Sequence, residues 1–316
     1  MRPFSTLAIA SLFAFSGQTA FADKLNVVTS IRPIESLVKS IGKDLTSVTT
    51  LVPANGSPHN YALKPSDAKN LQNADVIFWI DEHFEGFLEK AINTLPQHAT
   101  AVALAEQDGI QVLETREIDL NDDHQDEHAH EDGHDEHEGH EHGAHDLHIW
   151  LDPENAKVMS NIIAQTLSDQ DPANKAAYQQ NAAELIAKLD VLIASTTIQL
   201  APVQNKSFVT FHDAYQYFEN RFELKNVGVV SLNPETKPGA KRLQDLKTAL
   251  AENNIACVFS EPQFDEKLVT LAVDGTNVRA AELDPLGAHL NSGTALYFDL
   301  IEQLTSNVVN CLSPAQ

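Results

Sequence analysis

Histidine is the residue type in this sequence best suited to metal chemistry, and the fourteen histidines fall into two groups. Eight lie in one short segment, 119–146, and six are scattered over the rest of the chain. Three of the six (His59, His148 and His212) stand at the ends of apolar, strand-like segments, where ligands bind in parallel α/β sheets. Neutral imidazole is a common zinc ligand, and three of them make most of a tetrahedral site. The sequence therefore predicts a three-histidine metal site, with separate surface or core histidines as the alternative.

The segment 119–146 is the second histidine-rich feature, and its composition is extreme. It holds twelve acidic residues, no Lys or Arg, and eight histidines: His124, His128, His130, His134, His137, His140, His142 and His145. His130 to His134 matches the metalloprotease pattern H-E-x-x-H, but that pattern needs an amphipathic helix, and this segment is glycine-containing and almost without apolar residues. We interpret it as a disordered loop that binds metal weakly, with a solubilising linker as the alternative.

The overall charge excludes several classes of protein. Asp and Glu number 45 against 21 Lys and Arg, so the formal net charge is −24, and half of it lies in the segment 119–146. Nucleic acids and anionic lipid surfaces bind proteins through basic residues, so a strongly acidic chain is expected to bind neither. With 42% hydrophobic residues the chain can still form a sizeable core.

The N-terminus has the features of a secretory signal. Arg2 precedes an apolar stretch, and Ala20-Phe21-Ala22 is an A-x-A cleavage pattern, so we expect a signal peptide at 1–22 that is cleaved after Ala22. No cysteine follows the cleavage point, so we expect an exported, soluble protein without a lipid anchor. The two cysteines, Cys257 and Cys311, are expected to form a disulfide in an oxidising compartment.

Strand and helix signals alternate along the rest of the chain, which predicts an α/β fold with parallel sheets. Strands are expected at 25–30, 47–52, 75–80, 207–211, 227–232 and 256–260. A helical stretch at about 172–200 predicts a rod on the order of 40 Å, long enough to join two lobes. The order of elements at 25–52 resembles that at 207–232, which indicates two related lobes.

Five ordered motifs connect the sequence to a known family. They are Gly56-Ser57-Pro58-His59-Asn60-Tyr61 with Pro65-Ser66-Asp67, His148-Ile149-Trp150-Leu151-Asp152-Pro153, Phe211-His212-Asp213-Ala214-Tyr215, Glu261-Pro262-Gln263-Phe264 and Leu283-Asp284-Pro285-Leu286-Gly287. With these motifs the chain resembles the periplasmic zinc-uptake solute-binding proteins of zinc ABC transporters, over essentially the whole mature chain. The resemblance implies two similar α/β lobes with parallel central sheets, joined by one long rigid helix, and zinc in the cleft between them.

The resemblance also implies boundaries and a ligand set. It places the N-terminal lobe at 23–170, the linking helix at 171–201 and the C-terminal lobe at 202–316, and it makes His59, His148 and His212 the zinc ligands. Relatives often have Glu where this chain has Pro58, which leaves water, Asp284 or a histidine of the 119–146 segment as the fourth ligand. Three imidazoles favour zinc over manganese. His83, His98 and His289 have no comparable context and are expected to be structural.

The expected function is zinc capture in the periplasm and delivery to an inner-membrane permease driven by a cytoplasmic ATPase. The protein is expected to be a monomer without enzymatic activity or nucleic-acid partner, with a periplasmic zinc chaperone as a further candidate partner. Binding should weaken as the pH falls through roughly 6.5, because protons compete for imidazole. The rival hypotheses are a secreted zinc hydrolase, with Asp213 or Asp284 as its base, and a metal buffer without a transporter.

Overall fold

The computed structural model describes residues 24–96, 98–118, 145–234, 236 and 238–313. The expected signal peptide 1–22 and its cleavage after Ala22 lie outside the described residues. So do seven histidines of the acidic segment, namely His124, His128, His130, His134, His137, His140 and His142. His145, which we had counted in that segment, is described.

The N-terminal lobe is built on a four-stranded parallel sheet with the strand order β2-β1-β3-β4. Its strands are β1 (Leu25–Thr29), β2 (Thr46–Thr50), β3 (Val76–Trp79) and β4 (Thr100–Ala103), and its helices are α1 (Arg32–Gly42), α2 (Pro65–Gln72) and α3 (Gly86–Thr94). A 3₁₀ turn, η1 (Lys43–Leu45), joins α1 to β2. The central strand β1 pairs Val27 with Val48 on one side and with Val76 on the other.

The C-terminal lobe repeats this arrangement around a second four-stranded parallel sheet. Its strands are β7 (Ser207–Thr210), β8 (Lys225–Val229), β9 (Cys257–Ser260) and β10 (Arg279–Glu282), and its helices are α6 (Gln216–Phe222), α7 (Ala240–Glu252), α8 (Lys267–Val273) and α9 (Leu296–Leu312). The order β8-β7-β9-β10 has the same topology as β2-β1-β3-β4. The predicted similarity of the two lobes is therefore confirmed, although α8, β10 and α9 were not predicted.

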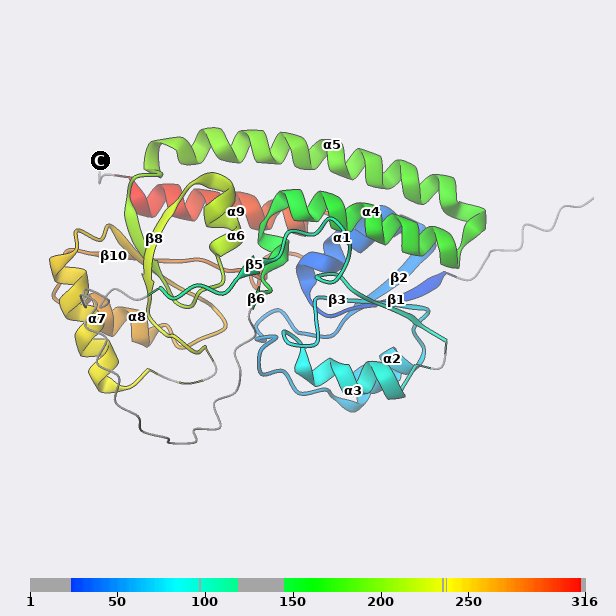
Figure 1. Ribbon diagram of the computed structural model, residues 1–316, viewed down its shortest axis with the longest axis horizontal. Helices are drawn as coiled ribbons and strands as arrows, with labels where there is room; N and C mark the ends of the chain where they lie inside the picture. The colour runs from blue at the N-terminus through cyan, green and yellow to red at the C-terminus, as the bar shows by residue number, and fades with distance from the viewer. Residues whose placement is uncertain (1–23, 97, 119–144, 235, 237, 314–316) are drawn as a thin grey trace, which may run out of the picture.

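Three long helices lie along one side of the molecule, and one of them spans both lobes. After the 3₁₀ turn η2 (Ile149–Leu151), α4 (Pro153–Gln170) begins at Asp152, whose side chain accepts a hydrogen bond from Glu154 N. The turn η3 (Pro172–Asn174) leads into α5 (Lys175–Leu200), which ends at η4 (Ala201–Val203). Figure 1 shows α5 extending over both lobes, with α4 and α9 beneath it. The predicted linking helix is thus present.

Among the described residues, the helical stretch Pro172–Val203, which includes α5, is the one that is long and apolar enough, by length and composition, to cross a membrane. One face of it, with Leu185, Leu189 and Leu192, is buried, and it packs on α1, α4 and α9. One continuous hydrophobic core therefore includes residues of both lobes. Two smaller clusters lie on the outer faces of the sheets, under α2 and α3 in one lobe and under α7 and α8 in the other.

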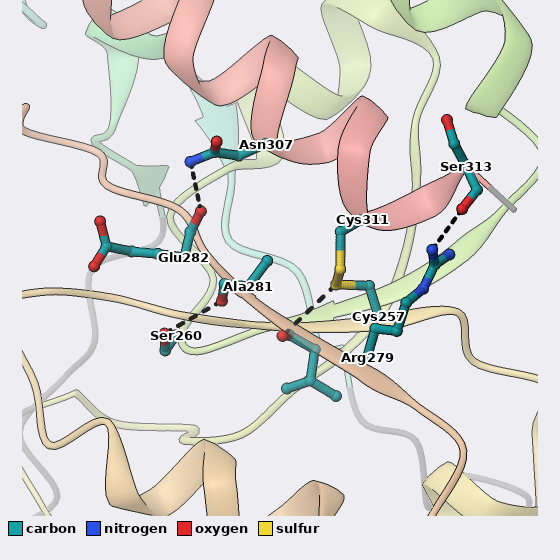
Figure 2. Close-up of a disulfide and its surroundings, with 9 residues drawn as sticks. Cys257, Ser260, Arg279, Ala281, Glu282, Asn307, Cys311 and Ser313 are labelled. Atoms are coloured by element: carbon teal, nitrogen blue, oxygen red, sulfur yellow. Dashed lines mark hydrogen bonds between the residues drawn. A yellow bond between two sulfur atoms is a disulfide. The ribbon is translucent and has the colours of Figure 1, made fainter. Parts of the chain in front are cut away.

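The predicted disulfide is present and attaches α9 to the second sheet. Cys257 in β9 is bonded to Cys311 in α9, with a Cα–Cα distance of 6.0 Å. Figure 2 shows two hydrogen bonds beside it, from Asn307 Nδ2 to Glu282 O at 2.9 Å and from Arg279 Nη1 to Ser313 O at 2.5 Å. The N-terminal end of α9 contacts the other lobe, because Tyr297 N donates to Ser36 Oγ at 3.0 Å.

A short antiparallel strand pair lies between the lobes (Figure 1). It consists of β5 (Leu113–Glu114) and β6 (His145–Asp146), with Leu113 opposite Asp146 and Glu114 opposite His145. This pairing corrects our boundary for the acidic segment, because His145 and Asp146 belong to an ordered strand. Composition alone groups these two residues with the acidic segment, but the pairing with β5 gives them a defined position.

Candidate metal centre

The three predicted ligands come together at the carboxyl edges of the two sheets. His59 lies in the loop after β2, and His212 lies in the loop after β7. His148 lies between β6 and η2, at the junction of the lobes. The strands of each sheet are parallel, so the loops that follow them emerge at one edge of that sheet, where ligands bind in this fold class.

The imidazoles are close enough to share one ion. The ring centroids are 5.4 Å apart for His59 and His148, 5.7 Å for His59 and His212, and 5.4 Å for His148 and His212. One ligand nitrogen from each ring lies within 4.8 Å of the other two. Zn–N bonds of about 2.0–2.1 Å place two ligands of one tetrahedral site about 3.4 Å apart, so binding would draw the three nitrogens closer together through small side-chain movements.

His148 is oriented by a buried carboxylate two residues before it. Asp146 Oδ1 accepts hydrogen bonds from His148 N at 3.0 Å and from the Nδ1 of the same ring at 2.8 Å. Tyr217 OH donates to the Asp146 carbonyl at 2.5 Å and accepts from Leu113 N at 2.9 Å, so the short strand pair is tied to the C-terminal lobe. A proton on Nδ1 leaves Nε2 of His148 as the metal-binding atom.

His212 is oriented in the same way by Glu261, which follows β9 in the C-terminal lobe. Glu261 Oε1 lies 2.8 Å from His212 Nδ1 and accepts from His212 N at 3.3 Å. Both residues are buried, and among the described residues His212 Nε2 has no hydrogen-bond partner. A buried, unpartnered imidazole nitrogen that faces two other imidazoles is the expected state of a metal ligand.

The surroundings shift the pKa values of the two buried imidazoles, His148 and His212, in opposite directions. Burial lowers the pKa of His148 well below its usual value, and the charge of His212 lowers it further. Burial also acts to lower the pKa of His212, but the charge and hydrogen bond of Glu261, with the charges of Asp213 and Asp146, raise it overall. Without metal, His148 therefore offers a free lone pair, whereas His212 holds its proton to a higher pH than a free imidazole does, so an incoming cation competes with that proton.

Aromatic rings form one wall of the site. The Phe84 ring lies 4.9 Å from the His59 ring and 5.3 Å from the His148 ring, and Trp150 lies 5.3 Å from His148, all between centroids. The histidines line a small pocket together with Trp150, Glu261 and Phe264. These rings limit the access of water and fix the ligand side chains.

Asp284 lies close to this pocket but is occupied by other hydrogen bonds. Its carboxylate accepts from the backbone N–H groups of Leu286 and Gly287 at 3.0 Å each, from Ala288 N, and from Gln263 Nε2 at 2.9 Å. Among the described residues, the group of possible ligand atoms within 4.8 Å contains the three histidines and no carboxylate. The structure thus uses Asp284 to cap the turn that follows it.

A model of a protein family described as "ZnuA: Zinc-uptake complex component A periplasmic" matches residues 27–311. The chain belongs to the ZnuA family. Its place among these transport binding proteins makes it a solute-binding protein and not an enzyme. This excludes the hydrolase that we had considered as a rival.

Several ZnuA proteins are similar over nearly their full length. The high-affinity zinc uptake system protein ZnuA of Brucella suis biovar 1 (strain 1330) is 42% identical over 327 residues, which cover 97% of each chain. The protein of the same name from Yersinia pestis is 35% identical over 289 residues, covering 90% of this chain and 91% of the relative.

Solved structures agree with the ZnuA fold. A structure described as "Crystal structure of ZnuA" has a TM-score of 0.76 at 26% identity and covers 92% of this chain and 100% of the other. The periplasmic zinc binding protein TroA from Treponema pallidum has the same TM-score and coverage at 22% identity, which supports the fold alone.

Sequence reasoning identified the three histidines but missed the residues that hold them. By composition Asp146 is one more acid of the acidic segment, and the motif that contains Glu261 does not by itself indicate a role for it. The signal for Glu261 was its position directly after a predicted strand, the same type of position as His212. His83 and His289 have exposed side chains, each near a carboxylate, and do not join the site.

Proposed function

We propose that this ZnuA-family protein captures Zn²⁺ in the periplasm with His59, His148 and His212 and delivers it to an ABC permease for high-affinity import. The single observation that carries this proposal is the convergence of the three imidazoles within 4.8 Å. Two of them are oriented by buried carboxylates, the arrangement that fixes the tautomer of metal-binding histidines. The relatives named zinc uptake system proteins support the same cargo.

The donor set favours zinc over other divalent cations. Three nitrogen ligands suit zinc, whereas manganese, magnesium and calcium prefer carboxylate and carbonyl oxygens. The fourth position is proposed to hold a water molecule. The four hydrogen bonds of Asp284 argue against it as a ligand in this arrangement. A histidine from the acidic segment remains the alternative.

The remaining features fit the same function. We propose that the acidic segment collects or buffers zinc near the site, because imidazoles and carboxylates attract cations. The signal peptide at 1–22, a soluble periplasmic monomer without a lipid anchor, and lobes at 23–170 and 202–316 around a linking helix at 171–201 complete the proposal. The partners are an inner-membrane permease with its cytoplasmic ATPase, and a periplasmic zinc chaperone is a further candidate.

The ligand assignment is tested by replacing His59, His148 and His212 together with alanine in a chain that lacks 119–144. The tight zinc site should disappear while the circular dichroism spectrum stays that of a folded α/β protein. Retained nanomolar zinc binding would refute the assignment. Delivery is tested by growth under zinc chelation: rescue by the full chain should require the permease, and rescue without the permease would instead support a simple metal buffer.

A further inference from the structure

The chain that enters the acidic segment is held against the C-terminal lobe by one arginine. Arg116, just after β5, donates from Nε and Nη2 to both carboxylate oxygens of Asp213, at 2.6 to 3.2 Å. Its Nη2 also donates to Glu219 Oε2. Asp213 directly follows the ligand His212, so this contact lies one residue from the metal centre.

The same network reaches His212 from its other side. Glu219 Oε1 accepts from Asn226 Nδ2 at 2.8 Å, and Asn226 Nδ2 also donates to Thr210 Oγ1 at 3.0 Å. Thr210 Oγ1 in turn donates to the carbonyl oxygen of His212 at 3.0 Å. The backbone around His212 is thus bracketed by Thr210 before it and Asp213 after it.

Burial makes this network more than a surface ion pair. The side chain of Glu219 is 2% exposed, that of Asp213 is 22% exposed and that of Arg116 is 26% exposed. Partly buried, bidentate arginine–carboxylate contacts have a defined geometry and are stronger than exposed pairs, which contribute little. Removal of the guanidinium would take away the bidentate contact that fixes the Asp213 side chain and would break the link between Asp213 and the buried Glu219.

We propose that Arg116 is a positioning residue for the metal centre, which acts through Asp213 to hold the His212 corner against the junction of the lobes. The inference rests on the proposed function, since it presumes that His212 binds the cargo. Together with the contact from Asp146 to His148, it means that both ends of the acidic segment are joined to ligand-bearing corners of the site. The chain on each side of the acidic segment is therefore attached beside a residue that positions a ligand, His212 in one case and His148 in the other.

The test compares Arg116→Gln with a matched control, Arg221→Gln. Arg221 forms a similar ion pair, with Nε and Nη2 at 2.8 and 2.7 Å from Asp152, and its side chain is 31% exposed. Its partner caps α4 and is not adjacent to a ligand. In the full chain, Zn²⁺ affinity is measured by competition with a chromophoric chelator strong enough to report the tight site alone.

Arg116→Gln should weaken zinc binding about tenfold, equal to about 1.4 kcal/mol, whereas Arg221→Gln should stay within about twofold of the unmodified chain. Arg116→Lys, which retains the charge but not the bidentate contact, should fall between. Urea unfolding of the apo proteins separates positioning from stability. If Arg116→Gln and Arg221→Gln lose similar amounts of stability, Arg116→Gln should still lose more zinc affinity than Arg221→Gln. Unchanged affinity in Arg116→Gln, or equal losses in both variants, would overturn the inference.

A second variant covers the case in which Arg116→Gln does not fold. Asp213→Asn removes the charge that pairs with Arg116 and should also weaken zinc binding, and unchanged affinity in this variant counts against the inference. If both single variants fold, the double variant should bind no more weakly than the weaker single one, because the two residues act as a unit. Weak zinc binding by the unmodified chain would instead contradict the proposed function itself.

Discussion

Two Asp-x-His segments in this chain adopt the same local geometry in different surroundings. In Asp81-Glu82-His83 and in Asp146-Leu147-His148, the aspartate Oδ1 accepts from both the backbone N–H and the ring Nδ1 of the histidine. The His83 side chain is 63% exposed, whereas that of His148 is 10% exposed and faces two other imidazoles. Local sequence determines the hydrogen bonds, and tertiary structure determines which histidine is a ligand.

This pair provides a controlled test of ligand orientation. Asp146→Asn retains the shape of the side chain but removes the carboxylate that accepts from the backbone N–H and the ring Nδ1 of His148 and so orients the ring. We expect zinc affinity to fall about 10- to 100-fold, the usual effect of removing such a partner. Competition with a chelator measures the change.

Asp81→Asn is the matched control, since it makes the same chemical change beside a histidine outside the site. Its zinc affinity should equal that of the unmodified chain. If the two variants lose affinity to the same extent, Asp146 has no special role in orienting a ligand.

Proton release provides a second test at the residue scale. Burial acts to lower the pKa of His212, but the charge and hydrogen bond of Glu261 raise it overall, so zinc competes with a proton that this ring holds to a higher pH than a free imidazole does. The affinity should therefore decline as the pH falls through the raised pKa of His212, starting above the usual value for histidine. Titration calorimetry in buffers of different ionisation enthalpy should detect this proton release.

In Glu261→Gln, the main influence that raises the pKa of His212 is gone, while burial still lowers it. The variant should release fewer protons on binding zinc at neutral pH, and the decline in affinity should move to lower pH. An unchanged proton count would mean that Glu261 does not control the protonation of His212.

The amount that sequence could predict at this scale has a physical limit. His59, His148 and His212 stood out because they mark the ends of apolar segments. Asp146 did not, because the strand β6 that orders it is two residues long and pairs with β5 on the far side of the acidic segment. A pairing between two short, distant strands has no periodic pattern to indicate it.

At the scale of elements, the strands predicted from the sequence are sufficient to place the ligand-bearing loops at the edges of the sheets. No side-chain contact has to be known for that prediction. The missed elements have clear reasons. The strand β10 is an edge strand with the sequence Arg-Ala-Ala-Glu, which lacks the β-branched residues typical of strands. The helix α9 is apolar on the face that packs against α1 and α5. Both of these helices are distant from α9 in the sequence, so the residues around α9 do not indicate what its apolar face packs against.

The disulfide between β9 and α9 should stabilise the fold without forming the site. It closes a loop with a sequence separation of 54 residues, which corresponds to about 4 kcal/mol in the chain-entropy model. The double variant Cys257→Ala and Cys311→Ala should lose about that amount in urea unfolding. Its zinc affinity should change by less than about threefold, because Glu261 is held by its own hydrogen bonds with His212.

The unmodified chain with and without reductant is the control, since it changes the bond and no side-chain volume. Reduction should lower the free energy of unfolding in the same direction. If reduction leaves the urea midpoint unchanged, the disulfide does not constrain the unfolded chain to the extent expected.

At the scale of the whole molecule, the two lobes are joined by a shared core as well as by α5. Trp150 Nε1 donates to Pro285 O at 2.8 Å, and Tyr297 OH donates to Trp150 O at 2.7 Å, both in buried positions. A further contact between the lobes comes from Arg32 in α1, which donates to the carbonyl oxygens of Gly287 and Leu290 in the C-terminal lobe. A wide separation of the lobes would break these bonds and expose apolar surface, so we expect cargo exchange to require only local movement around the pocket.

The strand pair β5–β6 suggests how the acidic segment can be removed without damage to the site. Deleting 119–144 leaves residues 115–118 as a four-residue connection between Glu114 and His145, a common length for a hairpin. This deletion removes eleven acidic residues and seven histidines, which changes the formal net charge from −24 to −13. The shortened chain should bind fewer zinc ions in total but retain its tight site.

Deleting 119–146 instead is the informative comparison, because it also removes Asp146 and the strand β6. Zinc affinity of the tight site should then fall about 10- to 100-fold, as for other losses of a ligand-orienting partner, although only two more residues are missing. Equilibrium dialysis gives the number of bound ions for both chains, and chelator competition gives the affinity. Equal affinities for the two deletions would show that the ordered end of the segment, and with it Asp146, does not support the metal centre.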